Sequence, residues 1–144
     1  MSTQQNMLLL GDGGVGKTSI KNRLLGSAFN QSYLPTFGIL PAIDGILDSS
    51  GQEKIGADWS SIAHDVDCIA IVFDLTNRLS FRNLRSWVDL ARREFPLRPI
   101  KILGNKLDCQ RRVKFREIEV FCSRQLCEYT EISAKQHINI DQVR

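Results

Sequence analysis

The 144-residue sequence predicts an α/β fold, in which helices cover both faces of a mostly parallel β-sheet. Short apolar runs alternate along the chain with segments of helical periodicity, which is the pattern of such folds. The run at residues 68–75, CIAIVFDL, is almost continuously apolar, as expected of a parallel strand that is buried on both faces. Polar motifs follow several of the predicted strands. Since ligands bind beyond the carboxyl ends of parallel strands, these motifs should gather at one edge of the sheet.

Strands are predicted where short apolar runs are bounded by turn residues, at residues 7–10, 39–43, 46–47, 68–75, 100–103 and 129–132. Asp44 and Gly45 separate the second run from the third and form a dipeptide typical of a hairpin turn. Residues 29–38 are polar and contain Pro35, which predicts a loop before that hairpin.

Helices are predicted where apolar residues recur every three or four positions, at residues 18–25, 80–95, 116–126 and from residue 139 onward. The second is the clearest, because its apolar residues form a single stripe, made of Phe81, Leu84, Val88 and Ala91. Pro96 then ends that helix. In the third helix, Leu126 is expected to face inward together with Ile118 and Cys122.

Composition and charge indicate one intracellular domain over residues 1–144. The length suits a single hydrophobic core, and the net charge of +3 is too small to argue for nucleic-acid binding. No CxxC pair occurs among the four cysteines, so free thiols in a reducing compartment are expected. Residues 1–6 do not resemble a signal peptide, and the longest apolar stretch, residues 68–73, is too short to span a bilayer. These features predict a cytoplasmic protein.

Residues 11–18, GDGGVGKT, fit the phosphate-binding pattern GxxxxGK[ST] between a predicted strand and a predicted helix. Glycines let the backbone turn so that several N–H groups can meet a phosphate, and the helix N-terminus favours its negative charge. We expect Lys17 to reach the β- and γ-phosphates and the Thr18 hydroxyl to bind Mg²⁺. Further nucleotide contacts are expected from the loop and the first helical turn, at Gly13, Gly14, Val15, Gly16 and Ser19.

Residues 48–53, DSSGQE, directly follow the apolar pair at 46–47. An aspartate at a strand end can hold Mg²⁺ through a water molecule, which gives Asp48 a place in the predicted metal site. The N–H of Gly51 can bind a γ-phosphate oxygen, and Gln52 can orient an attacking water. Alone, this motif is weak, since an ordinary polar turn would explain it. Beside the phosphate loop it becomes a strong indication.

Residues 105–108, NKLD, follow the predicted strand at 100–103 and indicate a guanine base. Asp108 offers two acceptor oxygens to the two N–H edges that guanine presents and adenine lacks. Asn105 can bond either the loop or the base, and the stem of Lys106 can cover the ring. After the last strand, a backbone N–H can meet the guanine carbonyl, in the motif formed by Ser133, Ala134 and Lys135.

Taken together, the motifs GDGGVGKT, FNQSYLPTFG, DSSGQE, NKLD and EISAK occur in the order found in small GTPases of the Ras superfamily, which the sequence resembles from residue 7 to about residue 143. The resemblance implies the three-layer P-loop NTPase fold and a GTP hydrolase of low intrinsic turnover. It also implies Mg²⁺ as the cofactor and GTP or GDP as the ligand. Residues 29–38 would form the first switch, and residues 48–66 would form the second.

The resemblance further implies roles for single residues. Phe29 would pack against the guanine and ribose, and Tyr33 would close over the phosphates. Thr36 would bind Mg²⁺ and the γ-phosphate in the GTP state only. Gln52 would be the catalytic glutamine, and Gly13 stands where the family needs a glycine for hydrolysis.

Two branches of the superfamily share features with this sequence. The segment DLTNRLSFRNLRSW at residues 74–87 resembles Rab proteins, whereas GQEKIG at residues 51–56 resembles Ran. The Rab resemblance implies a regulator of intracellular vesicle trafficking, and the Ran alternative implies nucleocytoplasmic transport and a nuclear location. Exchange factors, GTPase-activating proteins and effector proteins are the expected partners. A nucleotide-binding module without a productive switch cycle is a further alternative.

Two features depart from the family pattern. The stretch FGILPAIDGIL at residues 37–47 leaves room only for a shortened edge hairpin, because two average strands and a tight turn need about 12 residues. The last helix begins near residue 139 and is expected to stay incomplete, as in a C-terminally truncated domain. Part of the sheet is then expected to be uncovered. No cysteine stands at the C-terminus, so no prenyl membrane anchor is expected on this chain.

Overall fold

The computed structural model describes residues 5–26, 45–49 and 59–144 of the chain. Within these ranges, five strands form one sheet in the order β2-β1-β3-β4-β5, and every neighbouring pair is parallel. The strands are β1 (Met7–Leu10), β2 (Ile46–Asp48), β3 (Cys68–Asp74), β4 (Ile100–Asn105) and β5 (Glu128–Glu131). The predicted parallel core of the α/β fold is confirmed.

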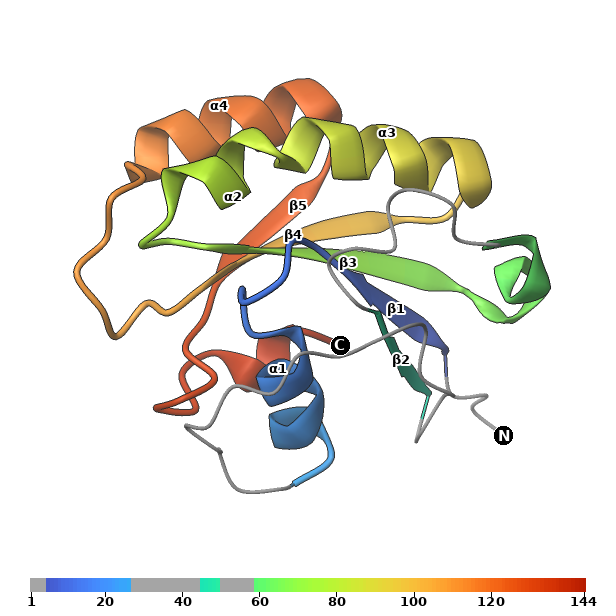
Figure 1. Cartoon of the computed structure of the whole chain (residues 1–144), viewed down its shortest axis with the longest axis horizontal. Coiled ribbons are helices and arrows are strands. Elements are labelled where there is room, and N and C mark those ends of the chain that lie inside the picture. The colour runs from blue at the N-terminus through green and yellow to red at the C-terminus, as the bar shows by residue number, and fades with distance from the viewer. Residues whose placement is uncertain (1–4, 27–44, 50–58) are drawn as a thin grey trace.

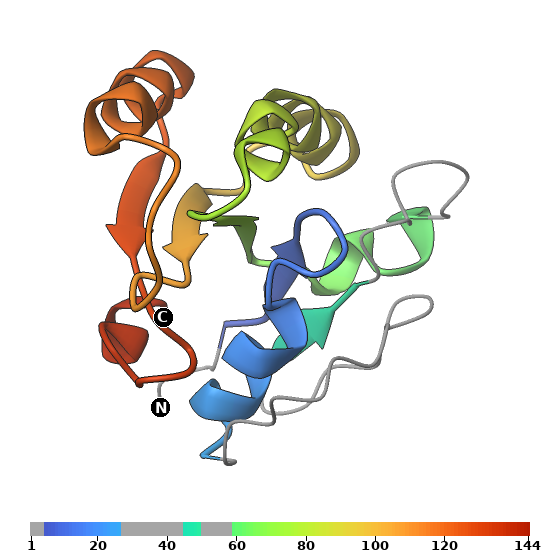
Figure 2. The ribbon, with the colours of Figure 1, turned by 60° about the vertical axis from the view of Figure 1, so that its left-hand side comes forward.

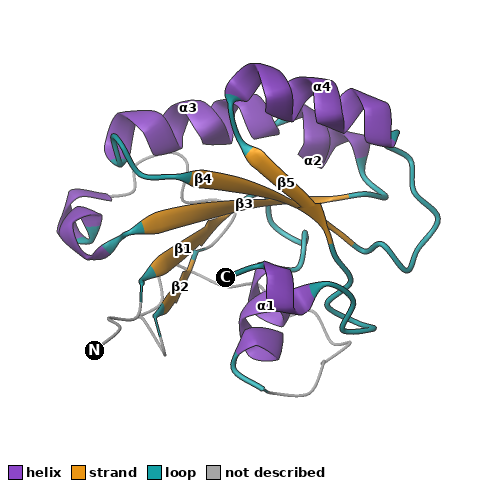
Figure 3. Ribbon diagram, turned by 180° about the vertical axis from the view of Figure 1, so that it is seen from behind, coloured by secondary structure: helices purple, strands orange, loops and turns teal. Residues whose placement is uncertain are grey.

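Helices cover both faces of the sheet, so the molecule has three layers (Figure 1). Helices α2, α3 and α4 lie over one face, and α1 lies on the other beside the C-terminal end of the chain, as Figures 2 and 3 also show. The bounds are α1 (Lys17–Leu24), α2 (Arg78–Arg82), α3 (Leu84–Glu94) and α4 (Phe115–Gln125). Short 3-10 helices occur at Trp59–Ser61, Ala63–Asp65 and Ile140–Gln142. None of the helices in the described ranges is both long and apolar enough to cross a bilayer.

Strand β3 shows how the two apolar layers arise from one sequence run. Alternate residues of a strand point to opposite faces of the sheet. Ile69, Ile71 and Phe73 belong to the core cluster that includes α3 and α4 residues, whereas Ala70 and Val72 belong to the cluster that includes α1 residues. All five side chains are at most 1% exposed. Burial on both faces therefore explains why this strand is almost continuously apolar.

The helix predicted over residues 80–95 is divided at Asn83, which separates α2 from α3. Asn83 keeps right-handed backbone angles, with φ −78° and ψ −8°, and its carbonyl accepts a hydrogen bond from the Trp87 N–H at 3.2 Å. The chain thus continues from α2 into α3 with only a local irregularity. The Asn83 side chain bonds to Asp12 in the glycine-rich loop, a long-range contact that helical periodicity does not reveal.

The sheet face beside α1 is buried at its centre but partly open toward β5, where Glu128 is exposed and Lys101 and Thr130 are half-buried. The uncovered part of the sheet that we predicted is therefore limited to that side, and its side chains are polar. The strand residues of that core cluster are at most 6% exposed, and Ala70, Val72, Leu103 and, directly after β5, Ile132 are at most 1% exposed. Ile140 and Val143 share the cluster with them and are buried in turn. The incomplete helix predicted from residue 139 onward is present as a 3-10 helix, Ile140–Gln142, entered through Asn139 at φ 58°.

Leu126 also departs from its predicted place. Ile118 and Cys122 of α4 are buried as expected, whereas Leu126 is 90% exposed. It forms the C-cap of α4 with left-handed backbone angles, φ 57° and ψ 41°. Because the chain leaves the helix at this residue, the helical spacing no longer sets the direction of its side chain.

The shortened edge hairpin falls largely outside the described residues, which exclude positions 39–44. Strand β2 begins at Ile46 as predicted and runs one residue further, to Asp48. It pairs in parallel with β1, and the Gly45 carbonyl accepts a hydrogen bond from the Met7 N–H at 2.7 Å. A three-residue edge strand therefore holds Asp48 at the carboxyl end of the sheet.

Candidate functional site

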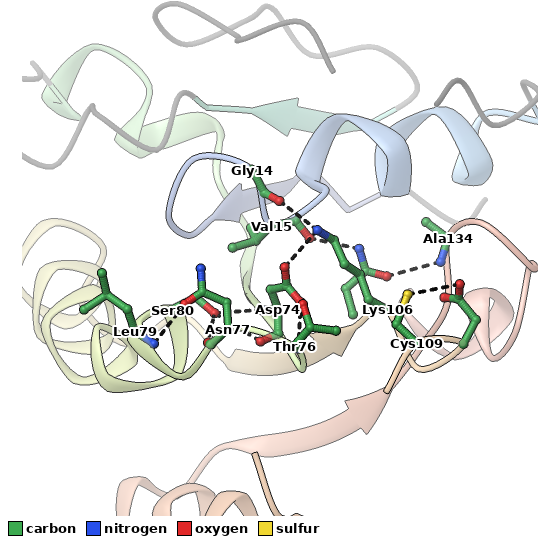
Figure 4. Close-up of polar contacts among 12 residues, drawn as sticks. Gly14, Val15, Asp74, Thr76, Asn77, Leu79, Ser80, Lys106, Cys109 and Ala134 are labelled. Carbon is green, nitrogen blue, oxygen red and sulfur yellow. Dashed lines mark hydrogen bonds and ion pairs between the residues drawn. The ribbon is translucent and has the colours of Figure 1, made fainter. Parts of the chain in front are cut away.

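The polar motifs predicted from the sequence do meet at the carboxyl edge of the sheet. The glycine-rich loop follows β1, Asp48 ends β2, Asn105 ends β4 and Ser133 follows β5. Figure 4 shows Lys106, which follows β4, in contact with Gly14 in the loop after β1 and with Asp74 at the end of β3. Topology therefore builds one site from segments that are far apart in the sequence.

Lys17 opens α1 and is held by the loop that precedes it. Its Nζ donates to the carbonyls of Gly11 and Asp12, both at 2.8 Å, and the residue is only 6% exposed. Burial lowers the pKa of Lys17 to about 8, although the negative charges of Asp48 and Asp12 oppose the shift. A poorly solvated ammonium group favours a nearby anion such as a phosphate, because the anion restores the interactions that burial removed.

Gly16 allows the glycine-rich loop to approach the NKLD motif closely. It has left-handed backbone angles, with φ 101° and ψ 23°, and a Cβ at this position would lie 2.3 Å from Nδ2 of Asn105. That Nδ2 donates to the Val15 carbonyl at 2.9 Å, while Oδ1 of Asn105 accepts from the Ala134 N–H at 3.2 Å. Of the two roles predicted for Asn105, the structure therefore supports the one in which it bonds the loop.

Thr18 and Asp48 come together from α1 and β2. The Thr18 hydroxyl donates to Oδ2 of Asp48 at 2.6 Å, and the other carboxylate oxygen, Oδ1, is buried without a hydrogen-bond partner in the described part of the chain. Burial raises the pKa of Asp48, although the Thr18 hydrogen bond and the charges of Lys17 and Lys21 lower it. A hydroxyl and an underused carboxylate are oxygen ligands of the kind that Mg²⁺ prefers, so these residues fit the predicted metal.

Lys106 connects the NKLD motif to the phosphate loop. Its ammonium group donates to the Gly14 carbonyl at 3.2 Å and lies 2.8 Å from Oδ2 of Asp74 (Figure 4). The other oxygen of Asp74 accepts from the N–H and the hydroxyl of Thr76, at 2.8 and 2.6 Å. Asp74 is 5% exposed, whereas the side chain of Lys106 is 37% exposed, so water reaches the pair from the lysine side only. The ammonium group of Lys106 is thus held by two oxygen atoms, one on Gly14 and one on Asp74. Its aliphatic stem remains available to cover a base.

Asp108 is fixed by the serine that follows β5. The Ser133 hydroxyl donates to Oδ1 of Asp108 at 2.6 Å and itself accepts from the Gln136 N–H at 3.0 Å. Desolvation alone would raise the pKa of Asp108, but the hydrogen bond from Ser133 and the charge of Lys135 contribute to a pKa below the ordinary value. Asp108 therefore stays ionised at neutral pH, as a double acceptor for guanine must.

The remaining nucleotide-site residues predicted in these segments also lie at this edge. Gly13 and Gly14 are exposed on the loop, Val15 is buried beneath it and Ser19 is half-buried in α1. Lys135 is exposed, next to the buried Ala134. The predictions for Phe29, Tyr33, Thr36, Gly51 and Gln52 fall outside the described residues.

The sequence motifs did not identify Arg23 or Lys21, which both come from α1. Arg23 donates to the carbonyls of Ala134 and Lys135, at 2.6 and 2.7 Å, and so ties α1 to the loop after β5. Lys21 is 5% exposed, and its charge acts on Asp48. Lys21 lies four residues after Lys17, and this spacing could have placed both lysines on one helix face. No local signal marks the target of Arg23.

Comparison with known proteins agrees with this site. A sequence model of the Ras family matches residues 6–144. The chain is 34% identical over 166 aligned positions to a Gibberella zeae protein named Ypt/Rab-type GTPase Rab7, a match that covers 99% of this chain and 81% of that protein. The fold, the order of the motifs and both matches lead to one conclusion: the chain belongs to the Ras family of small GTPases, is Rab-like, and is a GTP hydrolase.

Proposed function

We propose that this chain is a Rab-type molecular switch that binds GTP and GDP with Mg²⁺, hydrolyses GTP slowly and regulates vesicle trafficking from the cytoplasm. The observation that carries the proposal is the bridge made by Asn105, whose amide bonds Val15 in the phosphate loop and Ala134 in the base loop. A ligand with a phosphate chain at one end and a purine at the other fits such a bridged site. The similarity to the Rab7-type protein favours the Rab branch over the Ran alternative.

The roles within the proposed site divide between its two ends. Lys17 and the N–H groups of the loop would bind the β- and γ-phosphates, while Asp108 would bind the guanine edge. Thr18, Thr36 and Asp48 would hold Mg²⁺, which supplies positive charge to the phosphates when it is bound.

The switch itself involves residues at the γ-phosphate. Gln52 would orient the attacking water, and Gly51 and Thr36 would contact the γ-phosphate until it is hydrolysed and released. Loss of those contacts would free both switch segments, and Phe29 and Tyr33 would respond to the nucleotide from the first of them. We expect exchange factors, GTPase-activating proteins and effector proteins to recognise these changes. Nothing in the proposal requires nucleic acid.

The direct test is calorimetric titration of the purified chain with GDP, a GTP analogue and ATP in the presence of Mg²⁺, followed by timed hydrolysis of GTP. Affinity for GTP is expected to exceed that for ATP by about 10⁴-fold, because ATP leaves the carboxylate acceptors of Asp108 unpaired. The Gln52→Leu variant should hydrolyse GTP more slowly and bind it with unchanged affinity.

Different failures of this test lead to different conclusions. Equal affinity for ATP and GTP would contradict the assignment of the NKLD motif. Tight GTP binding with no hydrolysis, in wild type as in Gln52→Leu, would support the alternative of a module without a productive cycle.

Removal of Mg²⁺ is expected to accelerate release of bound nucleotide, because the phosphates then lose the charge that Thr18 and Asp48 help to hold. The Asp48→Asn variant should bind Mg²⁺ about 10- to 100-fold more weakly, as is usual when a partner of the metal shell is lost. The measurement is the dissociation rate of a fluorescent GDP analogue over a range of Mg²⁺ concentrations.

Asp141→Asn provides the matched control, since Asp141 is exposed in the C-terminal 3-10 helix. It should release nucleotide at the wild-type rate at every Mg²⁺ concentration. Identical Mg²⁺ dependence in Asp48→Asn and Asp141→Asn would exclude Asp48 from the metal site.

A further inference from the structure

The side-chain carboxylate of Asp12, in the phosphate loop, is bonded to helix residues on the sheet face opposite α1. Oδ2 of Asp12 accepts a hydrogen bond from Nδ2 of Asn83 at 2.7 Å, and Oδ1 of Asp12 accepts one from Nε1 of Trp87 at 2.8 Å. Asn83 lies at the junction of α2 and α3, and Trp87 follows one turn later in α3, so both donors come from the same helix face. Both oxygens of the carboxylate are therefore held from one rigid element.

The two donors are well placed to restrict the loop. Trp87 is 1% exposed and belongs to the main core cluster, so its indole cannot shift without disturbing the packing around it. Asn83 is half-buried, and its backbone carbonyl accepts from the N–H of Trp87. A carboxylate bonded at both oxygens loses the rotational freedom of its side chain, and its own peptide becomes ordered with it.

That peptide is part of the phosphate site. The backbone carbonyl of Asp12 accepts the hydrogen bond from Nζ of Lys17 at 2.8 Å, so a continuous chain of contacts runs from α3 through Asp12 to Lys17. Both groups that hold the Asp12 side chain are neutral. The coulombic interaction of Asp12 with Lys17 favours the ammonium form that a phosphate requires.

We propose that Asn83 and Trp87 are positioning residues of the nucleotide site, which hold Asp12 so that the phosphate loop and Lys17 are ordered before nucleotide binds. The inference rests on the proposed nucleotide function, and it adds α3 to the elements that determine nucleotide affinity. Preorganisation of this kind lowers the cost of binding, so its loss should appear as faster nucleotide release.

The test is the dissociation rate of a fluorescent GDP analogue, with Mg²⁺ present, from wild type, Asn83→Ala, Asp12→Ala and the double variant. Asn83→Ala should accelerate release by about 10-fold, the effect of losing one hydrogen bond to a charged group, and Asp12→Ala, which loses both hydrogen bonds, should accelerate it at least as much. The double variant should release GDP at the rate of Asp12→Ala alone, because residues that act through one contact are not additive.

Asn77→Ala is the matched control. It removes the same amide group from the same helical segment, where Oδ1 of Asn77 caps α2 by accepting from the Leu79 N–H at 3.0 Å. Loss of this cap should lower the melting temperature, as Asn83→Ala also should, but it should leave the GDP dissociation rate unchanged. If Asn83 contributes only to stability, Asn83→Ala and Asn77→Ala should release GDP at the same rate.

A spectroscopic readout follows the contact itself. The chain has two tryptophans, so a sample labelled with ¹⁵N at tryptophan gives two indole N–H resonances, which the Trp87→Phe variant assigns. The Trp87 resonance should shift in Asp12→Ala, and it should stay in place in Asn77→Ala. Should wild type bind no GDP, the proposed function fails together with this inference. Should wild type bind GDP while Asn83→Ala releases it at the wild-type rate, or the double variant prove additive, only this inference is overturned.

Discussion

Replacement of Lys17 by methionine is expected to abolish binding of guanine nucleotide while leaving the nucleotide-free protein folded. Lys17 is the buried cation of the phosphate loop, and its loss removes the charge that offsets the phosphates. Loss of a charge-assisted contact to a buried anion costs about 3–5 kcal/mol, which corresponds to at least about 100-fold in affinity. The measurement is a calorimetric titration with GDP in the presence of Mg²⁺.

The nucleotide-free Lys17→Met protein should melt no lower than wild type, because burial of the ammonium group already works against folding. The pKa of Lys17 is about 8 in the folded chain and 10.5 in its ordinary state, so the folded state binds this proton less tightly than the unfolded state does. Between these two pH values the contribution of Lys17 to stability rises with pH. Any advantage of Lys17→Met in melting temperature should therefore shrink between about pH 8 and pH 10.5. A variant that binds GDP as wild type does would remove Lys17 from the phosphate site.

The second large effect is expected from Asp108→Asn, which should convert the preferred base from guanine to xanthine. The asparagine amide keeps one acceptor but replaces the other by a donor, so it faces the exocyclic amine of guanine with the wrong group. Xanthine carries an oxygen at that position and can accept from the new donor. Affinity for GDP should fall by about 10³-fold, and xanthosine diphosphate should become the better ligand. Competition titrations of the two nucleotides measure the change.

Ser133→Ala is the graded control for this prediction. It removes the hydroxyl that orients Asp108 at 2.6 Å but leaves both carboxylate acceptors in the site. Affinity for GDP should fall by about 10-fold, the effect of one hydrogen bond to a charged group, without a gain for xanthosine diphosphate. An Asp108→Asn protein that still prefers GDP would contradict the proposed recognition of the base edge.

Local patterns in the sequence were sufficient for the strands that the structure describes and for the edge of the sheet at which the motifs meet; the strand predicted at residues 39–43 lies outside the described residues. Strand β1 has its predicted bounds, and β3 differs from the prediction by one residue, because buried parallel strands require apolar side chains on both faces. The motifs gather at one edge because parallel strands all end there. Turn and end geometry was less predictable. Leu126 turns away from the core because its backbone is left-handed. The last segment forms a 3-10 helix that begins directly after Asn139, which is also left-handed.

What the sequence determined by itself, then, is the set of residues to which the proposed chemistry is assigned: a phosphate loop with Lys17 and Thr18, a carboxylate proposed for a metal at Asp48 and an acceptor proposed for guanine at Asp108. Their identity is encoded in short motifs, because phosphate and base recognition need particular atoms at close spacing along the chain. Only the tertiary structure determined which other side chains hold these site residues in position. Asp12 meets Asn83 and Trp87 across 71 and 75 residues, and Asn105 meets Val15 across 90. Such contacts depend on how helices and strands pack together. The periodicity of side chains within one helix or strand does not predict which distant residues it will contact.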